Sequence, residues 1–354
     1  MAANADQQDR LVEAVGAAFA ERLPLQIAGS GSKVFLTEPG TSRGRADVGR
    51  LLSVAEHSGV TEYRPEELVV TARAGTTLKE LEQQLARERQ MLPFEPPRFS
   101  GAGTLGGAIA SGLSGPGRPW YGSLRDAVLG VEMINGRGEF LRFGGQVMKN
   151  VAGYDVSRLQ AGAFGTLGVL LSASIKILPK PVHELTCVIA LEAEIALERL
   201  REWARLPLPI TATCHVDGQL RVRLSGAESA VVWAAGHIGG DVVHAEPFWS
   251  QVRNHEIDFF KREGTLWRLS LPPNSLLTDE PTLIEWGGAL RWVRSEQAMF
   301  DWARQQGGYA LPFNGDYSTQ YFLQVDRGLR KRIKKAFDPA EVLNPLTDVV
   351  PDAN

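Results

Sequence analysis

The residues of this chain best suited to hold a ligand are glycines in short clusters. Seventeen of the 37 glycines fall between Gly101 and Leu170, in groups such as Thr104-Leu-Gly-Gly107, Ser111-Gly-Leu-Ser-Gly115 and Ala161-Gly-Ala-Phe-Gly-Thr-Leu-Gly168. Glycine costs backbone entropy, so folded domains concentrate it where φ is positive or where the backbone closely approaches another group. Apolar runs over 127–134 and 169–178 separate the clusters, which favours ligand-binding loops over a flexible linker.

An earlier loop has the composition of a phosphate site. A short strand is predicted over 25–28, and Gly29-Ser-Gly-Ser-Lys33 follows it directly. Consecutive amides in such a loop can form an anion-binding nest, to which Lys33 would add positive charge. Taken alone, the segment fits an ordinary surface loop equally well.

A helix of small residues is predicted over 104–113. Gly106, Gly107 and Ala110 allow close approach of another backbone or a ligand. A pyrophosphate at the N-terminal end would gain from unpaired amides and from the helix dipole. Two separate glycine-rich regions therefore favour a long ligand with two phosphates, lying between subdomains.

Other catalytic constellations are missing from the sequence. The six histidines have no metal-ligand spacing, and neither a nucleophile elbow, a G-x-x-x-x-G-K-[ST] loop nor a Rossmann fingerprint occurs. Cys187 and Cys214 form no C-x-x-C pair, so we expect no disulfide framework or iron–sulfur site. The net charge of −3 gives no field for nucleic acid. The sequence shows neither a secretory signal nor an apolar run of the roughly 18 residues that suggest a membrane span.

The pattern of apolar residues predicts an α+β fold. An amphipathic helix is expected over 9–22, a strand over 67–73, and a helix capped by Thr77 and Glu80. Asn135-Gly136 predicts a hairpin turn, and a long strand is expected over 169–178. After Pro181 strands and helices alternate as in a second α+β domain. Six of the nine residues from Arg327 to Lys335 are basic, which fits a solvated helix face or a docking patch for an acidic partner.

Several segments together resemble a known family of flavoproteins. The loop 28–33, the stretch 64–77, Thr104-Leu-Gly-Gly107 and 162–169 resemble the FAD-binding domain of the vanillyl-alcohol oxidase / p-cresol methylhydroxylase (PCMH) type. Within that group, 94–97, 115–120, 142–155, 286–292 and 337–345 are similar to the FAD-binding subunit of bacterial glycolate oxidase. The resemblance implies a two-subdomain PCMH-type domain over 1–181, an α+β (ferredoxin-like) cap or substrate domain over 182–325, and a C-terminal helix and tail over 326–354 that return toward the flavin.

The resemblance also implies a set of FAD-binding residues. These are Gly29, Ser30, Gly31, Ser32, Lys33, Pro96, Thr104, Leu105, Gly106, Gly107, Ser111, Gly112, Tyr121, Gly122, Val131, Gly165, Leu167, Gly168 and Val169. The first loop has no histidine, so we expect noncovalent FAD. Leu346 follows Asn344-Pro345 where relatives often have glycine, and 307–321 is short for the subunit.

The implied activity is oxidation of glycolate to glyoxylate, with electrons passing through flavin to an iron–sulfur subunit and quinone. The implied partners are that subunit and a larger FAD subunit, in a cytoplasmic complex peripheral to the inner membrane. Arg268, Arg291 and Lys149 are candidates to bind the substrate carboxylate, and the proton-accepting base is not identified. A non-catalytic FAD relay or scaffold, and a complex acting on D-lactate or another 2-hydroxy acid, stay open as alternatives.

Overall fold

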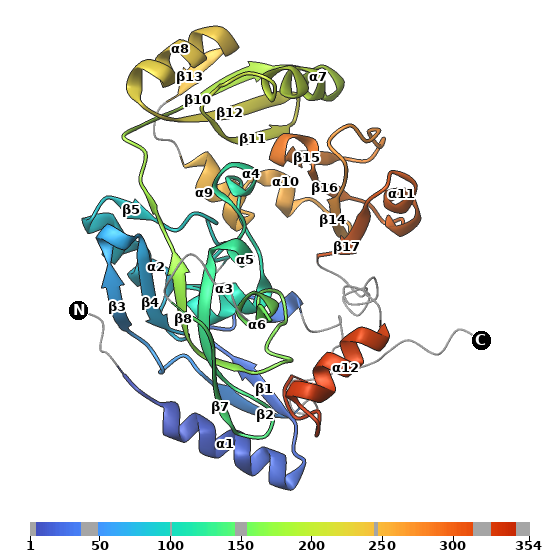
Figure 1. Cartoon of the computed structure of the whole chain (residues 1–354). Helices are drawn as coiled ribbons and strands as arrows, with labels where there is room; N and C mark the ends of the chain where they lie inside the picture. Colours follow the sequence, from blue (N-terminus) through green and yellow to red (C-terminus); the bar gives the residue numbers. More distant parts are fainter. Residues whose placement is uncertain are drawn as a thin grey trace. The chain divides into compact units, whose positions relative to one another are not determined.

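The chain forms two compact units in a computed structural model that describes residues 5–36, 49–99, 101–145, 154–243, 247–313 and 327–344 (Figure 1). Unit 1 consists of 1–113, 123–179 and 319–354, and unit 2 of 114–122 and 180–318. Each unit therefore contains segments far apart in the sequence. The domain boundaries expected after 181 and 325 stay predictions.

Unit 1 is built around a five-stranded antiparallel sheet. Its elements are α1 (Gln8–Glu21), β1 (Leu25–Ala28), η1 (Val34–Leu36), β2 (Arg50–Ser53), β3 (Val60–Arg64), η3 (Pro65–Glu67), β4 (Val69–Arg73), α2 (Leu78–Arg87), β5 (Gln90–Met91), α3 (Leu105–Ser111), α5 (Leu124–Ala127), β6 (Val128–Ile134), β7 (Phe140–Gly144), α6 (Val156–Leu159), β8 (Val169–Lys176), β9 (Leu178–Pro179) and α12 (Arg327–Phe337). The sheet order is β3-β4-β8-β6-β7, and β1 with β2 forms a separate parallel pair.

Strand β8 connects the two apolar cores of unit 1. Leu170 joins a cluster with the leucines of α2 and with α3, whereas its neighbour Leu171 joins a cluster with α1 and β1. Adjacent strand residues point to opposite faces, so β8, which is buried along all but its last residue, contributes side chains to both cores. The expected strand over 169–178 is thereby confirmed for 169–176, whereas Ile177 lies outside the strands and Leu178 belongs to β9.

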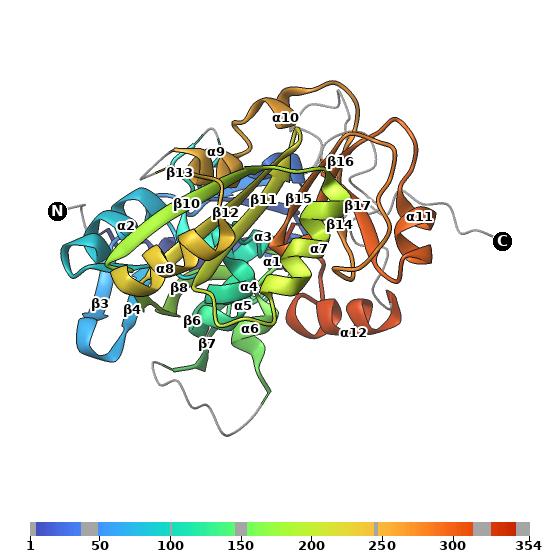
Figure 2. The same cartoon turned by 90° about the horizontal axis from the view of Figure 1, so that it is seen from above.

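Unit 2 contains one eight-stranded antiparallel sheet (Figure 2). Its elements are α4 (Arg118–Tyr121), β10 (His183–Ala190), α7 (Ala193–Trp203), β11 (Ile210–Val216), β12 (Gln219–Gly226), α8 (Glu228–Ile238), β13 (Asp241–Val243), α9 (Phe248–Asn254), α10 (Asp258–Lys261), β14 (Leu266–Ser270), β15 (Thr282–Glu285), η4 (Trp286–Gly288), β16 (Leu290–Arg294), α11 (Phe300–Gln305) and β17 (Tyr309–Pro312). The α+β class expected from the sequence is confirmed.

The sheet of unit 2 is a repeat of two ferredoxin-like halves. The strand order is β13-β10-β12-β11-β15-β16-β14-β17. Numbered within each half, the strands run 4-1-3-2 and then 2-3-1-4, so the two halves meet through their second strands, β11 and β15. In the first half α7 connects strands one and two, whereas residues 271–281 make the same connection in the second half without a helix.

None of the described helices is long and apolar enough to span a bilayer.

Candidate functional site

A small cavity in unit 1 brings together the two glycine-rich regions expected to bind phosphate. It has a volume of about 90 Å³ and lies at the end of β1 and beside α3. Its lining residues are Ile27, Ala28, Gly29, Ser30, Gly31, Ser32, Lys33, Val34, Thr104, Gly107, Ala110, Ser111, Phe164 and Asn344. Eight of the nineteen residues expected to bind FAD are among them: Gly29, Ser30, Gly31, Ser32, Lys33, Thr104, Gly107 and Ser111.

The loop after β1 offers a row of free donors to this cavity. β1 pairs in parallel with β2, and the chain turns at Gly31 with φ of 74°. Within the described part of the chain, the amides of Gly29 to Lys33 donate to no protein acceptor. Consecutive free amides around a concave loop are suited to bind an anion.

Lys33 contributes an unneutralised cation to the same loop. Its Nζ lies 3.4 Å from the Ser32 hydroxyl and 5.6 Å from the centre of the Phe99 ring. No carboxylate of the described residues pairs with it, and burial lowers the pKa of Lys33 to about 8. A phosphate bound here would offset this desolvation and hold the ammonium in its charged form.

Helix α3 differs from the sequence-based expectation. Its first amides are not free: Leu105 donates to the Thr76 carbonyl at 2.9 Å and Gly106 to the Ala74 carbonyl at 2.8 Å. The Gly107 amide donates to the Thr104 hydroxyl at 3.2 Å. The expectation of unpaired amides at this helix end is therefore wrong, because carbonyls in the turn after β4 already accept hydrogen bonds from them. The free donors of the cavity come from the first loop instead.

The glycines of α3 have two different tasks. A Cβ on Gly106 would lie 2.8 Å from the Ala74 Cβ, so Gly106 allows α3 to pack against the end of β4. A Cβ on Gly107 would meet only the Thr104 hydroxyl, at 3.1 Å, and Gly107 lines the cavity. Gly168, like Gly106, allows close packing, since a Cβ there would lie 2.9 Å from the Ile134 carbonyl oxygen. Only Gly107 of these three faces ligand space.

The third glycine segment is attached to the carboxyl end of α3. The amides of Gly162 and Phe164 donate to the carbonyls of Ile109 and Ala110, at 3.0 and 2.8 Å. Gly112 ends α3 with φ of 65°, and a Cβ there would lie 2.9 Å from the Gly162 nitrogen. This places Phe164 at the cavity wall.

Asn344 joins the first loop to the third segment. Its Oδ1 accepts from the Ile27 amide and its Nδ2 donates to the Phe164 carbonyl, both at 2.6 Å. Behind it, Lys334 of α12 donates to Thr166, Asp338 and Leu343, each at 2.6 or 2.7 Å. The C-terminal segment therefore fixes the spacing of two cavity walls.

The expected FAD set lacks six residues that line the cavity: Ile27, Ala28, Val34, Ala110, Phe164 and Asn344. Of these, Ala110 was expected only to allow close approach of another backbone or a ligand. Asn344 lies within the family-like segment 337–345, and this was the signal that could have identified it.

The remaining expected FAD residues lie outside this cavity. Leu105, Val131 and Val169 have side chains in the apolar cores, and Leu167 is also buried. Pro96, Gly106, Gly112, Gly165 and Gly168 belong to unit 1 but do not line the cavity, and Tyr121 and Gly122 belong to unit 2. The assignment of these residues to FAD stays a prediction.

The candidate substrate-binding cations do not converge. In β14 Arg268 pairs across the sheet with Trp292, whereas Arg291 of β16 pairs with Leu269. Neighbouring strand positions alternate between faces, so the two arginines lie on opposite faces of one sheet. Arg291 is fully buried and donates to the carbonyls of Ser275 and Leu276, which leaves it a structural role. Lys149 lies outside the described residues.

Comparisons with known proteins identify the family. Residues 1–144 match the FAD binding domain family. The chain is 44% identical over 346 residues to glycolate oxidase subunit GlcE of Escherichia coli (strain K12), covering 96% of this chain and 97% of that protein. The chain belongs to the GlcE family.

Two further comparisons cover different shares of the chain. Glycolate oxidase subunit GlcD of Bacillus subtilis (strain 168) is 31% identical over 160 residues, which is 45% of this chain and 33% of that protein. A solved structure of alkyldihydroxyacetonephosphate synthase superposes with a TM-score of 0.66 at 16% identity, covering 95% of this chain and 75% of that one. The second likeness concerns the fold alone.

Proposed function

We propose that this chain is the FAD-binding subunit of a glycolate dehydrogenase complex that oxidises glycolate to glyoxylate. The observation that carries the proposal is the match to a GlcE subunit along nearly the whole of both chains. The cavity of unit 1 supports it, because free loop amides and an unneutralised lysine are what a diphosphate requires.

The residues of unit 1 fit the cofactor. Gly29 to Lys33 would hold the diphosphate of FAD, and Gly107 leaves room for it beside α3. Asn344 keeps the first loop at a fixed distance from the Phe164 segment. Bound flavin supplies the redox chemistry, as the acceptor of a hydride equivalent and donor of electrons.

We expect FAD to be bound noncovalently. Neither histidine nor cysteine is among the lining residues of the cavity. Acid precipitation of the purified chain should therefore release yellow flavin to the supernatant, at one FAD per chain. Flavin that stays in the pellet would contradict this.

The partners in the proposal are a GlcD-type FAD subunit and an iron–sulfur subunit that passes electrons to quinone. The relatives' subunit names support an assembly with other glycolate oxidase subunits. We place this complex in the cytoplasm, peripheral to the inner membrane. Co-purification of the tagged chain with its natural partners tests the assembly.

A second candidate is a non-catalytic subunit that relays electrons or stabilises the complex. It is favoured by the two described candidate arginines, which lie on opposite faces of the unit 2 sheet, since of these two Arg268 alone stays available to hold a carboxylate. Complexes that carry Arg268→Leu or Lys33→Gln distinguish the two. Catalysis in this subunit predicts loss of glycolate oxidation in both variants. An electron relay predicts loss in Lys33→Gln alone, and a scaffold predicts activity in both. Parallel assays with D-lactate decide the substrate.

A further inference from the structure

Helix α8 of unit 2 is apolar on its outer side as well as on its inner side (Figure 1). The inner side is buried against β10 and β12 and consists of Val231, Ala234, Ala235 and Ile238. The outer side is exposed and consists of Ser229, Val232, Trp233 and Gly236. Its two large side chains, Val232 and Trp233, are 56% and 59% exposed. A helix that is apolar all round is normally covered on both sides, which indicates that the outer side of α8 is a contact surface.

Helix α7 shows how an ordinary solvated helix of this unit differs. It packs on the same apolar cluster as α8, and its exposed positions include Glu194, Glu198, Arg199, Arg201 and Glu202. In α8 the only side chains that can carry charge are Glu228 and His237, at the two ends of the helix. Depletion of charge around an exposed tryptophan is typical of the centre of a protein–protein interface.

The exposed tryptophan is held in place by its own helix. The Trp233 ring stacks on the His237 ring one turn later, with ring centres 5.5 Å apart and planes 15° from parallel. An aromatic side chain that is already ordered loses less entropy on association than a mobile one. Trp233 is therefore suited to be the central contact of an interface.

The order of side chains along this face is symmetric about the midpoint between Val232 and Trp233. The small residues Ser229 and Gly236 lie at equal distances on either side of it, and no atom lies within 4 Å of a Cβ at Gly236. In an antiparallel pair of two such helices, Ser229 of one copy lies opposite Gly236 of the second copy, and the large side chains meet in the centre. The small residues would let the two helices approach closely there.

The charges at the ends also fit an antiparallel pair. Glu228 of one copy lies at the same height as His237 of the second copy, so like charges do not meet at either end. The helix dipoles also oppose each other, with each N-terminus beside a C-terminus. A parallel pair would instead place the two Glu228 side chains at the same end.

We propose that a second copy of this chain covers the outer face of α8, through a two-fold antiparallel pairing of the two α8 helices. A two-fold interface uses the same patch on both copies, so the patch must be complementary to itself, as the symmetric order of the α8 face is. Because α8 has 11 residues and spans about 16 Å, the contact is small and the dimer should dissociate on dilution.

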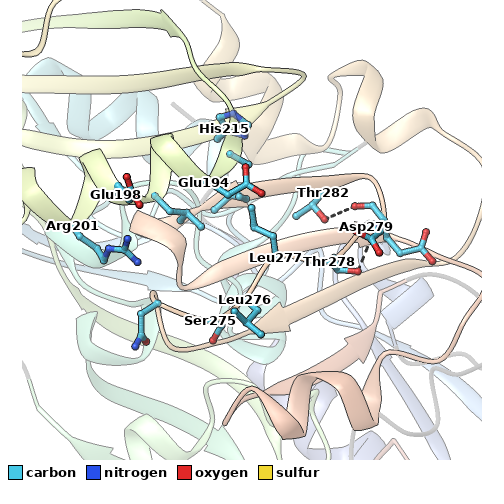
Figure 3. A pocket seen from close by; sticks show the side chains of 15 residues that line it. Glu194, Glu198, Arg201, His215, Ser275, Leu276, Leu277, Thr278, Asp279 and Thr282 are labelled. Atoms are coloured by element: carbon cyan, nitrogen blue, oxygen red, sulfur yellow. Dashed lines mark hydrogen bonds between the residues drawn. The ribbon is translucent and has the colours of Figure 1, made fainter.

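Sedimentation equilibrium of the full chain with FAD added, from about 1 µM to about 1 mM, tests the pairing. We expect a concentration-dependent exchange of monomer and dimer, with a dissociation constant at least about tenfold larger in Trp233→Ser. Leu276→Ser is the matched control, because Leu276 is 70% exposed but lies in a separate groove of about 620 Å³ between α7 and the segment 274–280 (Figure 3).

Two outcomes of this experiment would overturn the proposal. One is a chain that stays monomeric at every concentration, and the other is equal weakening of the dimer in Trp233→Ser and Leu276→Ser. If the chain is monomeric and Trp233→Ser loses a subunit that co-purifies with the wild-type chain, the face belongs to that subunit and not to a second copy.

Disulfide cross-linking tests the register with substitutions at two open positions. Ser229→Cys and Gly236→Cys are prepared separately, and the native cysteines, Cys187 and Cys214, are buried. In the antiparallel pair, positions 229 of the two copies lie about 10 Å apart along the helices, too far for a disulfide, whereas 229 lies opposite 236. A mixture of the two variants should therefore cross-link at least about tenfold faster than either variant alone. Equal rates in the mixture and in the single variants would contradict the pairing.

Discussion

At the scale of single residues, Lys33 links the proposed flavin site to pH. Its ammonium is half-buried beside Phe99, no carboxylate among the described residues pairs with it, and burial lowers its pKa to about 8 from 10.5. The ligand-free fold thus disfavours the charged form that a diphosphate needs. Between these two values the unfolded chain binds more protons than the folded chain, so the free energy of unfolding of the ligand-free protein rises with pH in that window.

The affinity for FAD should fall as pH rises, whereas the free energy of unfolding of the ligand-free protein rises. The cation is present below about pH 8 and is lost as pH rises, so we expect about tenfold weaker binding at about pH 9.5 than at about pH 7. Lys33→Gln should bind weakly at both values, and Lys33→Arg should hold FAD without this pH dependence. Fluorescence titration with FAD measures all three. A pH profile shared by the wild-type chain and Lys33→Gln would show that Lys33 is not the titrating group.

Two adjacent glycines of α3 separate a ligand effect from a packing effect. Gly107→Val should reduce FAD content strongly while the melting temperature of the ligand-free chain stays nearly unchanged, because its Cβ meets only the Thr104 hydroxyl. Gly106→Val should lower that melting temperature, because its Cβ would overlap Ala74. Calorimetry and flavin absorbance measure both. Gly236→Val is the control, since no atom lies within 4 Å of a Cβ there.

At the scale of elements, the C-terminal segment acts as a brace for the cavity. Asn344→Asp keeps the acceptor for the Ile27 amide but places a carboxylate oxygen against the Phe164 carbonyl. It also adds negative charge where phosphate is expected, so FAD affinity should fall about tenfold or more. Gln83→Glu on α2 adds the same charge at an exposed position outside the cavity and should bind FAD normally. Equal affinities of the two variants would remove Asn344 from the site.

Elements with local determinants were predictable, and those that depend on distant partners were not. The capping box of Thr77 and Glu80 begins α2. The leucines of this helix, Leu78, Leu81 and Leu85, are fully buried, as their spacing on one helical face predicts. The donors of α3 were misjudged because their acceptors, Ala74 and Thr76, lie about thirty residues earlier in the chain. Asn344 acts across more than three hundred residues, so no spacing rule could pair it with Ile27.

The repeat of the two halves of the unit 2 sheet could not be predicted from the sequence, for a related physical reason. Its halves share strand order and not residue pattern, and one half lacks the connecting helix whose periodicity would mark it. In the structure the chain turns at Gly287, with φ of 65°, between β15 and β16.

At the scale of the whole molecule, a division of labour between subunits follows from what each unit offers. Unit 1 holds the cavity proposed for the diphosphate, and in unit 2 Arg268 lies 5.3 and 5.9 Å from the centres of the Trp286 and Trp292 rings. Removing a hydride from a 2-hydroxy acid also requires a base for the hydroxyl proton. His255, close to Trp292, is a poor candidate because burial lowers its pKa to about 3.

The isolated chain should therefore hold FAD but reduce it slowly, or not at all, with glycolate. Full activity should return when the proposed GlcD-type and iron–sulfur subunits are present, because we expect them to supply a proton acceptor and the electron exit. Anaerobic stopped-flow measurement of flavin bleaching compares the isolated chain with the complex. Lys33→Gln, which we expect to weaken FAD binding, provides the baseline without this subunit's flavin. Bleaching of the isolated chain at the turnover rate of the complex would instead make it an autonomous enzyme, and Arg268→Leu would then be the first variant to examine.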